Sequence, residues 1–129
     1  MQVQVVRSTD GGSTWSQPVP VAPGVTHDQM LPWIAVSPTG LVGVTWLDRR
    51  NDPANVSFQA LAAISSDGGL SFEPNVELTS EFSNPDEGIG PWSYFDGCTW
   101  DGPNYFLAAW MQLNTGRDTQ INVGGIRLK

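Results

Sequence analysis

The sequence predicts an all-β protein built from short antiparallel strands. No stretch of ten residues keeps a sustained 3.6-residue apolar period, so we expect no long amphipathic helix. The chain contains 14 Gly and 10 Pro, residue types that punctuate turns and interrupt helices. Short runs rich in Val, Ile, Thr and aromatic residues recur between clusters of Gly, Pro, Asn and Asp, a pattern typical of antiparallel sheets.

These runs predict nine strands. Their expected bounds are Val3 to Arg7, Pro18 to Ala22, Trp33 to Ser37, Leu41 to Leu47, Val56 to Ser65, Phe72 to Leu78, Tyr94 to Trp100, Tyr105 to Leu113 and Ile121 to Leu128.

Short turn-forming sequences separate most of the consecutive strands. The first two flank S-T-D-G-G-S-T-W at 8–15, and the third and fourth flank S-P-T-G at 37–40. The fifth and sixth flank S-S-D-G-G-L-S-F at 65–72, and the seventh and eighth flank D-G-P-N at 101–104. Gly, Pro, Asn and Asp in such strings supply the backbone conformations that tight turns need. The ninth strand follows the loop after the eighth.

Composition narrows the classes of function. The 129 residues suffice for one domain, and an apolar fraction of 40% against 15% charged residues predicts a folded core. A net charge of −7 repels nucleic-acid phosphates and anionic membranes, so neither is an expected partner. Cys98 is the single cysteine, which excludes an internal disulfide. His27 is the single histidine, so the chain lacks the Cys and His ligands typical of a zinc site. We expect no cofactor.

A repeat organises the strands. The string beginning at Ser8 returns at Ser65, and Pro32-Trp33 returns as Pro91-Trp92 at a similar spacing. Two units of about 60 residues with four strands each have the period of propeller blades, not of helical solenoids. The sequence therefore predicts a single domain, residues 1–129, of two blade repeats.

The repeated string resembles the Asp box, S-x-D-x-G-x-T-W, of the sialidase-like (BNR repeat) β-propellers. The first copy matches at every position, and the second has Ser71 for Thr and Phe72 for Trp. The segments D-Q-M-L-P-W-I-A-V and G-L-V-G-V-T-W-L-D-R-R resemble the inner strand pair of these repeats, and the chain from Gly90 resembles their C-terminal blade. The resemblance implies an extracellular or periplasmic location, although residues 1–7 show no signal region.

We expect the two boxes to be structural. Asp10 and Asp67 can accept hydrogen bonds from N–H groups of their own turns, while Trp15 and Phe72 should enter the core. In an up-and-down blade, both boxes share one end of the sheets with the turns at 37–40 and 101–104. The longer segments 23–32, 48–55, 79–93 and 114–120 lie at the opposite end, here called the loop face, where function is expected.

The candidate functional residues of the loop face are its charged and aromatic side chains. They are Asp28, Trp33, Asp48, Arg49, Arg50, Asp52, Asp86, Glu87, Trp92, Tyr94 and Arg117. The predicted ligand-binding set is Asp28, Trp33, Asp48, Arg49, Arg50, Trp92, Tyr94 and Arg117.

Each group carries an alternative interpretation. The Arg49–Arg50 pair suits a sugar carboxylate, but either arginine could instead pair with Asp48 or Asp52 to fasten the loop. Trp33 and Trp92 offer flat faces to a sugar ring, or they pack between blades. Loop acids could supply the two carboxylates of a glycosidase, or they cap turns and face solvent.

Two classes of function follow. The first is a non-catalytic module that binds glycans or another protein; the second is part of a sialidase-type glycoside hydrolase completed by further blades. By resemblance, a sialidase requires an arginine triad, a tyrosine nucleophile with a glutamate partner and an aspartate acid/base. The chain has no F-R-I-P segment, and we assign no catalytic residue. A third alternative is a gene fragment without activity.

Assembly is expected because propellers close with about four to eight blades. Three chains joined head to tail would give a six-bladed ring, so a homotrimer of about 42 kDa is the expected form. Two four-stranded blades require eight strands, and the sequence predicts nine. The extra strand arises because the chain both begins and ends in a strand that corresponds to the third strand of a blade. Either a terminal strand is displaced or exchanged, or the chain belongs to a longer propeller.

Overall fold

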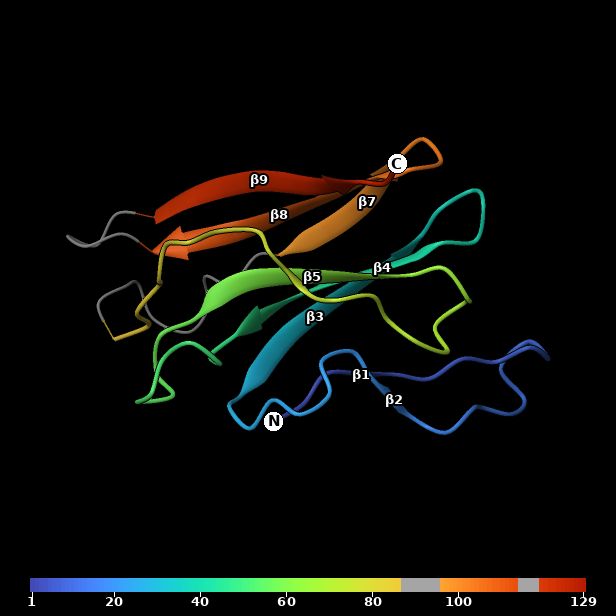
Figure 1. Ribbon diagram of the computed structural model, residues 1–129, viewed down its shortest axis with the longest axis horizontal. Coiled ribbons are helices and arrows are strands. Elements are labelled where there is room, and N and C mark those ends of the chain that lie inside the picture. Colours follow the sequence, from blue (N-terminus) through green and yellow to red (C-terminus); the bar gives the residue numbers. More distant parts are fainter. Residues whose placement is uncertain (87–95, 114–118) are drawn as a thin grey trace.

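The computed structural model describes residues 1–86, 96–113 and 119–129. Nine strands form three antiparallel sheets, and no helix occurs in these ranges (Figure 1). It follows that this part of the chain has no helix able to cross a membrane. The predicted all-β antiparallel fold class is confirmed.

The three sheets contain two, four and three strands in sequence order. The first sheet pairs β1 (Gln4–Val5) with β2 (Val19–Pro20). The central sheet consists of β3 (Gln29–Val36), β4 (Val42–Asp48), β5 (Gln59–Ser65) and β6 (Val76–Glu77). The last sheet consists of β7 (Gly97–Asp101), β8 (Tyr105–Leu113) and β9 (Thr119–Arg127).

Several strand boundaries differ from the prediction. β3 begins at Gln29 and not at Trp33, because a register shift between Met30 and Trp33 lets the strand continue through a bulge. Leu31 has φ 52° at this bulge, and Pro32 has no N–H to donate to the ladder. β1, β2 and β6 span two residues each, shorter than expected. The predicted start of the seventh strand, Tyr94, lies outside the described residues.

The central sheet is covered on both faces. Every residue of β4 and β5 is buried. One apolar cluster joins Val44 and Trp46 to Val3 and Val21 of the first sheet and its flank. Two further clusters join the other face to the last sheet, one through Trp110 and the other through Phe106. Strands buried on both faces read as continuous apolar runs, which explains why β4 and β5 show little alternation in sequence.

The first sheet repeats the register of the central sheet. Gln4 pairs with Pro20 as Leu61 pairs with Glu77, at the same spacing that separates the two D-G-G strings. β1 and β2 are therefore the counterparts of β5 and β6.

The last sheet repeats the central sheet from its other end. Gly97 pairs with Ala109 as Trp33 pairs with Thr45. In the same way, Trp110 in β8 corresponds to Trp46 in β4. β7, β8 and β9 are thus the counterparts of β3, β4 and β5.

The two D-G-G turns are held by their aspartates. Asp10 accepts from the Thr14 N–H at 2.9 Å and from the Thr14 hydroxyl at 2.7 Å. Asp67 accepts from the N–H groups of Leu70 and Ser71, each at 2.9 Å, and from the Ser71 hydroxyl at 2.6 Å. These bonds, led by those from the Thr14 and Ser71 hydroxyls, lower the pKa of both carboxyls. The expected hydrogen bonding within each turn is confirmed.

The aromatic residues that end the two strings differ in burial. Phe72 is partly buried and packs on the cluster between the first and central sheets, as expected. Trp15 is 62% exposed, so the expectation that it enters a core is wrong. The described first sheet has only two strands, and they leave Trp15 without a covering layer.

Tight turns gather at one end of the sheets, as predicted (Figure 1). The Thr39 hydroxyl donates to the Pro103 carbonyl at 3.3 Å, which links the turns of the central and last sheets. Arg7 donates to the Asp67 and Gly68 carbonyls at 3.4 Å, which links the first sheet to the second D-G-G turn. The loop between β4 and β5, one of the predicted longer segments, is at the opposite end (Figure 1).

Candidate functional site

The site on the loop face is built where β3 and β4 pair at their ends. Gln29 opens β3 and pairs with Asp48, which closes β4. Both side chains are 1% exposed. Because the segments entering β3 and leaving β4 are neighbours at this edge, the residues on either side of this pair come together on one surface.

Asp48 is the centre of a buried polar network. Its Oδ2 accepts from Arg50 Nη2 at 2.6 Å, from Trp46 Nε1 at 2.7 Å and from Gln29 Nε2 at 3.3 Å. Its Oδ1 accepts from the Arg50 N–H at 2.8 Å. The Arg50 guanidinium lies 6.0 Å from the Trp46 ring centroid, within cation–π range.

The network determines the charge of Asp48. Burial favours the neutral carboxyl, but the hydrogen bonds from Arg50 and Trp46 and the Arg50 charge outweigh it and lower the pKa of Asp48. The group is therefore ionised at neutral pH and forms a buried ion pair with Arg50.

The same network connects the first sheet to the central sheet. Gln29 Oε1 accepts from the Val3 N–H at 2.8 Å. Arg50 Nη1 donates to Asn75 Oδ1 at 3.0 Å, and Asn75 Nδ2 donates to the Val21 carbonyl at 3.1 Å. Arg50 therefore fastens both its own loop and the first sheet, the structural alternative considered for this arginine.

A second ion pair lies nearer the surface. Arg49 Nη1 is 3.8 Å from Asp28 Oδ2, and Asn55 Nδ2 donates to the same oxygen at 3.0 Å. The Met1 ammonium also contacts Asp28. Hydrogen bonds from Met1 and Asn55 lower the pKa of Asp28. Asn55 has φ 56°, a left-handed conformation that Asn tolerates better than most residues.

Asp52 folds the loop between β4 and β5. Its carboxylate accepts from the N–H groups of Ala54 at 3.0 Å, Val56 at 2.9 Å and Ser57 at 2.6 Å. These backbone bonds, with that of Ser57 the strongest, lower the pKa of Asp52. Asp52 acts as a loop cap and does not pair with either arginine.

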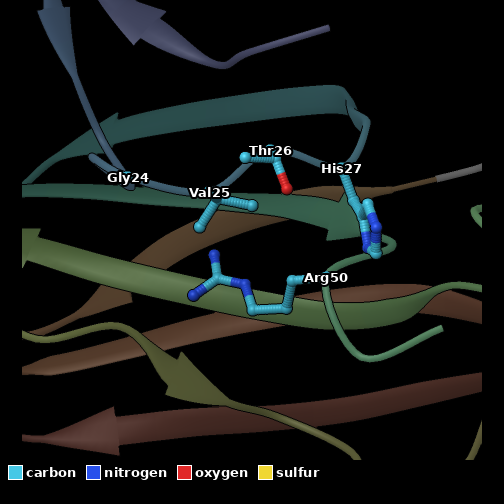
Figure 2. Close-up of a pocket in the computed structure, with 5 residues that line it drawn as sticks. All are labelled: Gly24, Val25, Thr26, His27 and Arg50. Carbon is cyan, nitrogen blue, oxygen red and sulfur yellow. The ribbon is translucent and has the colours of Figure 1, made fainter. Parts of the chain in front are cut away.

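A hollow of about 230 Å³ opens beside Arg50 (Figure 2). Its lining is Gly24, Val25, Thr26, His27 and Arg50. His27 Nδ1 lies 3.1 Å from the Arg49 carbonyl oxygen, which holds the ring at the edge of the hollow. Arg50 Nε is buried and has no hydrogen-bond partner. The hollow therefore combines a hydroxyl, an imidazole and a guanidinium, groups suited to a small polar ligand.

The predicted site residues separate into groups. Asp28 and Arg49 lie together at the surface, whereas Asp48 is buried beneath it with its acceptors engaged. Trp33 is 52% exposed and lines a different hollow, between β1 and β3. Asp86 is exposed in the described part of the chain. The other candidates, Glu87, Trp92, Tyr94 and Arg117, lie outside the described residues.

Sequence reasoning located the loop but missed several of its residues. The segment Gly24–His27 lies in the predicted functional loop, and Gly24 with φ 82° marks its turn. His27 gave no sequence signal beyond its position in this loop, because a single His without a neighbouring ligand or catalytic partner predicts no chemistry. Nothing in the sequence around Asn75 signals its bridge to the first sheet, because that bridge spans residues far apart in the chain.

Comparisons with known proteins give a likeness among the solved structures. No protein-family model and no curated protein matches the chain. The chain is similar to a crystal structure of a protein of unknown function from Dyadobacter fermentans DSM 18053, with a TM-score of 0.52 and 15% sequence identity. The match covers 99% of this chain and 46% of that one. The likeness shows a shared all-β fold, and the chain spans about half the length of its neighbour.

Proposed function

We propose that the chain is a sialidase-like propeller module that acts as a non-catalytic unit of assembly and binding. The observation that carries the proposal is that part of the outer face of the last sheet is uncovered in the described structure. In the central sheet, the corresponding face is completely covered by the next sheet in the chain.

The register identifies the corresponding residues. The outer-face pairs Met111–Ile121 and Ala109–Val123 match Leu47–Ala60 and Thr45–Ala62 of the central sheet. All four central-sheet residues are buried.

In the described structure, the outer face of the last sheet is apolar and open around Val123, whereas Met111 on the same face is buried. Ile121 is 61% exposed and Val123 is 67% exposed. A hollow of about 290 Å³ adjoins Val123, Leu107 and Ala109 on this face. An apolar sheet face of this kind is stabilised by a covering layer.

We take a second copy of the chain as the covering partner. Stacking of the last sheet of one copy on the first sheet of the next is a heterologous contact, which forms a closed ring when the rotation per copy divides a full turn. A homotrimer is the ring expected from two blade repeats in each copy, since six blades are within the usual range for a propeller. A longer polypeptide that supplies further sheets would cover the same face.

Light scattering coupled to size exclusion tests the assembly. We expect the wild-type chain at about 42 kDa, three times its 14.0 kDa, if three copies close a ring. Val123→Lys places a charge on the outer face and should give a 14.0 kDa monomer. The matched control is Gln120→Lys on the same strand, which should leave the mass unchanged. A wild-type monomer would refute self-assembly.

The binding part of the proposal concerns the hollow beside Arg50. Its hydroxyl, imidazole and guanidinium favour weak binding of neutral or acidic saccharides, whose hydroxyl groups both donate and accept hydrogen bonds. The glycoside hydrolase remains the alternative proposal, in which groups from further sheets would join this face.

A further inference from the structure

The two faces of the central sheet are covered to different extents. On one face, the last sheet reaches β3, where Trp100 Nε1 of β7 donates to the Ala35 carbonyl at 3.1 Å. On the other face, the first sheet packs on β4 and β5 through the cluster that contains Val44 and Trp46. Trp33 and Ile34 of β3 are each 52% exposed.

β1 has an open edge where its counterpart has a partner. β5 pairs with β6 on one side and with β4 along seven residues on the other. β1, the counterpart of β5, pairs only with β2 in the described structure. The missing neighbour is the counterpart of β4.

Hydrogen bonding shows which backbone groups face this edge. The Val3 carbonyl accepts from the Val21 N–H at 3.1 Å, and the Arg7 carbonyl accepts from the Ser16 N–H at 2.8 Å, so these residues direct their backbone groups toward β2 and its flank. Because direction alternates along a strand, Gln4 and Val6 direct theirs toward the open edge. Their counterparts in β5, Leu61 and Ala63, pair there with Trp46 and Val44.

An apolar hollow lies along the same edge. It has a volume of about 220 Å³ and is lined by residues 3–6, Pro32, Trp33, Ile34 and Val44. Its floor is therefore β3 and β4, and one wall is the backbone of β1.

We propose that this hollow is a docking groove for an extended apolar strand, which pairs antiparallel with β1 and lays side chains over Ile34 and Trp33, each 52% exposed. The occupant is a partner segment with the pattern of β4, in which small or aliphatic residues face the central sheet. Another sheet face would cover the apolar floor but would leave the N–H and C=O groups of Gln4 and Val6 unpaired. The site goes beyond the proposed assembly face, which lies on the last sheet.

A labelled synthetic peptide with the sequence of residues 41–48 tests the groove on the full chain. We expect saturable binding by fluorescence anisotropy and slower amide hydrogen exchange at Gln4 and Val6. Val6→Pro removes the edge N–H and should weaken the affinity about tenfold or more. Val6→Ala keeps the N–H and should bind like the wild type.

A second pair of variants probes the floor of the groove. Ile34→Asp should abolish peptide binding, whereas Val36→Asp, on the same strand but outside the lining, should retain it. Thermal unfolding establishes that each variant is folded. Equal peptide affinity of folded Val6→Pro and wild type would overturn the proposal, as would absence of binding at millimolar peptide.

Self-association is a separate outcome. If Val6→Pro dissolves an oligomer of the chain, the occupant is a second copy, and the assignment to a partner segment is wrong. Val123→Lys distinguishes the two proposals, because it should disrupt assembly while peptide binding stays unchanged. A wild-type monomer that binds the peptide would refute assembly alone.

Discussion

Asp48 is a buried charge, since its carboxylate is ionised although the residue is 1% exposed. A buried charge is tolerated only when it is paired and hydrogen-bonded. Arg50 supplies the pair, and Trp46 and Gln29 supply further donors. In the D-R-R string, Asp48 and Arg50 therefore stabilise the fold by pairing with each other.

Replacement of Arg50 should destabilise the protein. Arg50→Met keeps the length of the side chain but leaves Asp48 unpaired, and we expect a loss on the order of 2 to 4 kcal/mol in the free energy of unfolding. Urea denaturation measures it. The double variant Asp48→Asn, Arg50→Met removes both charges and should recover part of the loss. A single variant as stable as the wild type would show that Asp48 needs no counter-charge.

Acid should weaken the second D-G-G turn. The folded pKa of Asp67 lies below its ordinary value of 3.8, so its stabilisation is complete above that value and is lost as pH falls through the folded pKa. Asp67→Asn should melt at a lower temperature than the wild type at pH 7, and the difference should narrow progressively below pH 4. A difference that does not depend on pH would contradict this mechanism.

Asp10→Asn serves as the matched comparison for Asp67. The two aspartates make the same kinds of hydrogen bonds. Asp10 joins a two-stranded sheet, whereas Asp67 joins strands of the central sheet, so we expect a smaller decrease in melting temperature from Asp10→Asn. Calorimetry at pH 7 measures the melting temperatures of both variants. A larger decrease from Asp10→Asn than from Asp67→Asn would contradict this expectation.

At the scale of elements, one glycine determines how closely the central and last sheets approach. A Cβ atom on Gly43 would lie 2.2 Å from the Phe106 ring. Phe106 is fully buried, so the ring has little room to move. The small residue in β4 and the large one in β8 are therefore a matched pair.

Gly43→Ala should cost about 1 to 3 kcal/mol of stability through overpacking. Gly97→Ala is the control, because a Cβ at Gly97 meets no atom within 4 Å. Phe106→Leu combined with Gly43→Ala should recover stability relative to Gly43→Ala alone. Chemical denaturation measures the free energy of unfolding of the two single variants and the double variant. Equal values for Gly43→Ala and Gly97→Ala would mean that the two sheets move apart to accept the methyl group without loss of stability.

At the scale of the whole molecule, the sheets form a stack with turns at one end and loops at the other (Figure 1). This arrangement places the hollow beside Arg50 far along the strands from the D-G-G turns. Ligand binding and turn stability should therefore respond to different substitutions.

Saccharide titration tests that separation. Thr26→Val removes a hydroxyl from the hollow without touching either ion pair, and we expect it to weaken saccharide binding several-fold, since one hydrogen bond contributes about 1 kcal/mol. Asp10→Asn should leave the affinity of the folded protein unchanged. Absence of binding across a glycan array would contradict the saccharide proposal, and release of a fluorogenic aglycone would favour the hydrolase.

The local features of this protein could be predicted from its amino-acid sequence. Strand-forming runs between turn residues predicted the nine strands, and the D-G-G strings predicted turns held by Asp10 and Asp67, because these interactions join residues close together in the chain. The repeat also predicted which end of the sheets would carry the turns and which would carry the loops.

The burial and pairing of individual side chains could not be predicted without the tertiary structure. Whether Arg50 faces a ligand or Asp48, and whether Trp15 is covered, depends on neighbours supplied by distant segments, such as Asn75 for Arg50. The bulge that extends β3 to Gln29 is likewise set by its pairing with β4. Burial and ion pairing are properties of the assembled sheets, and a local sequence pattern contains no record of which surfaces will meet.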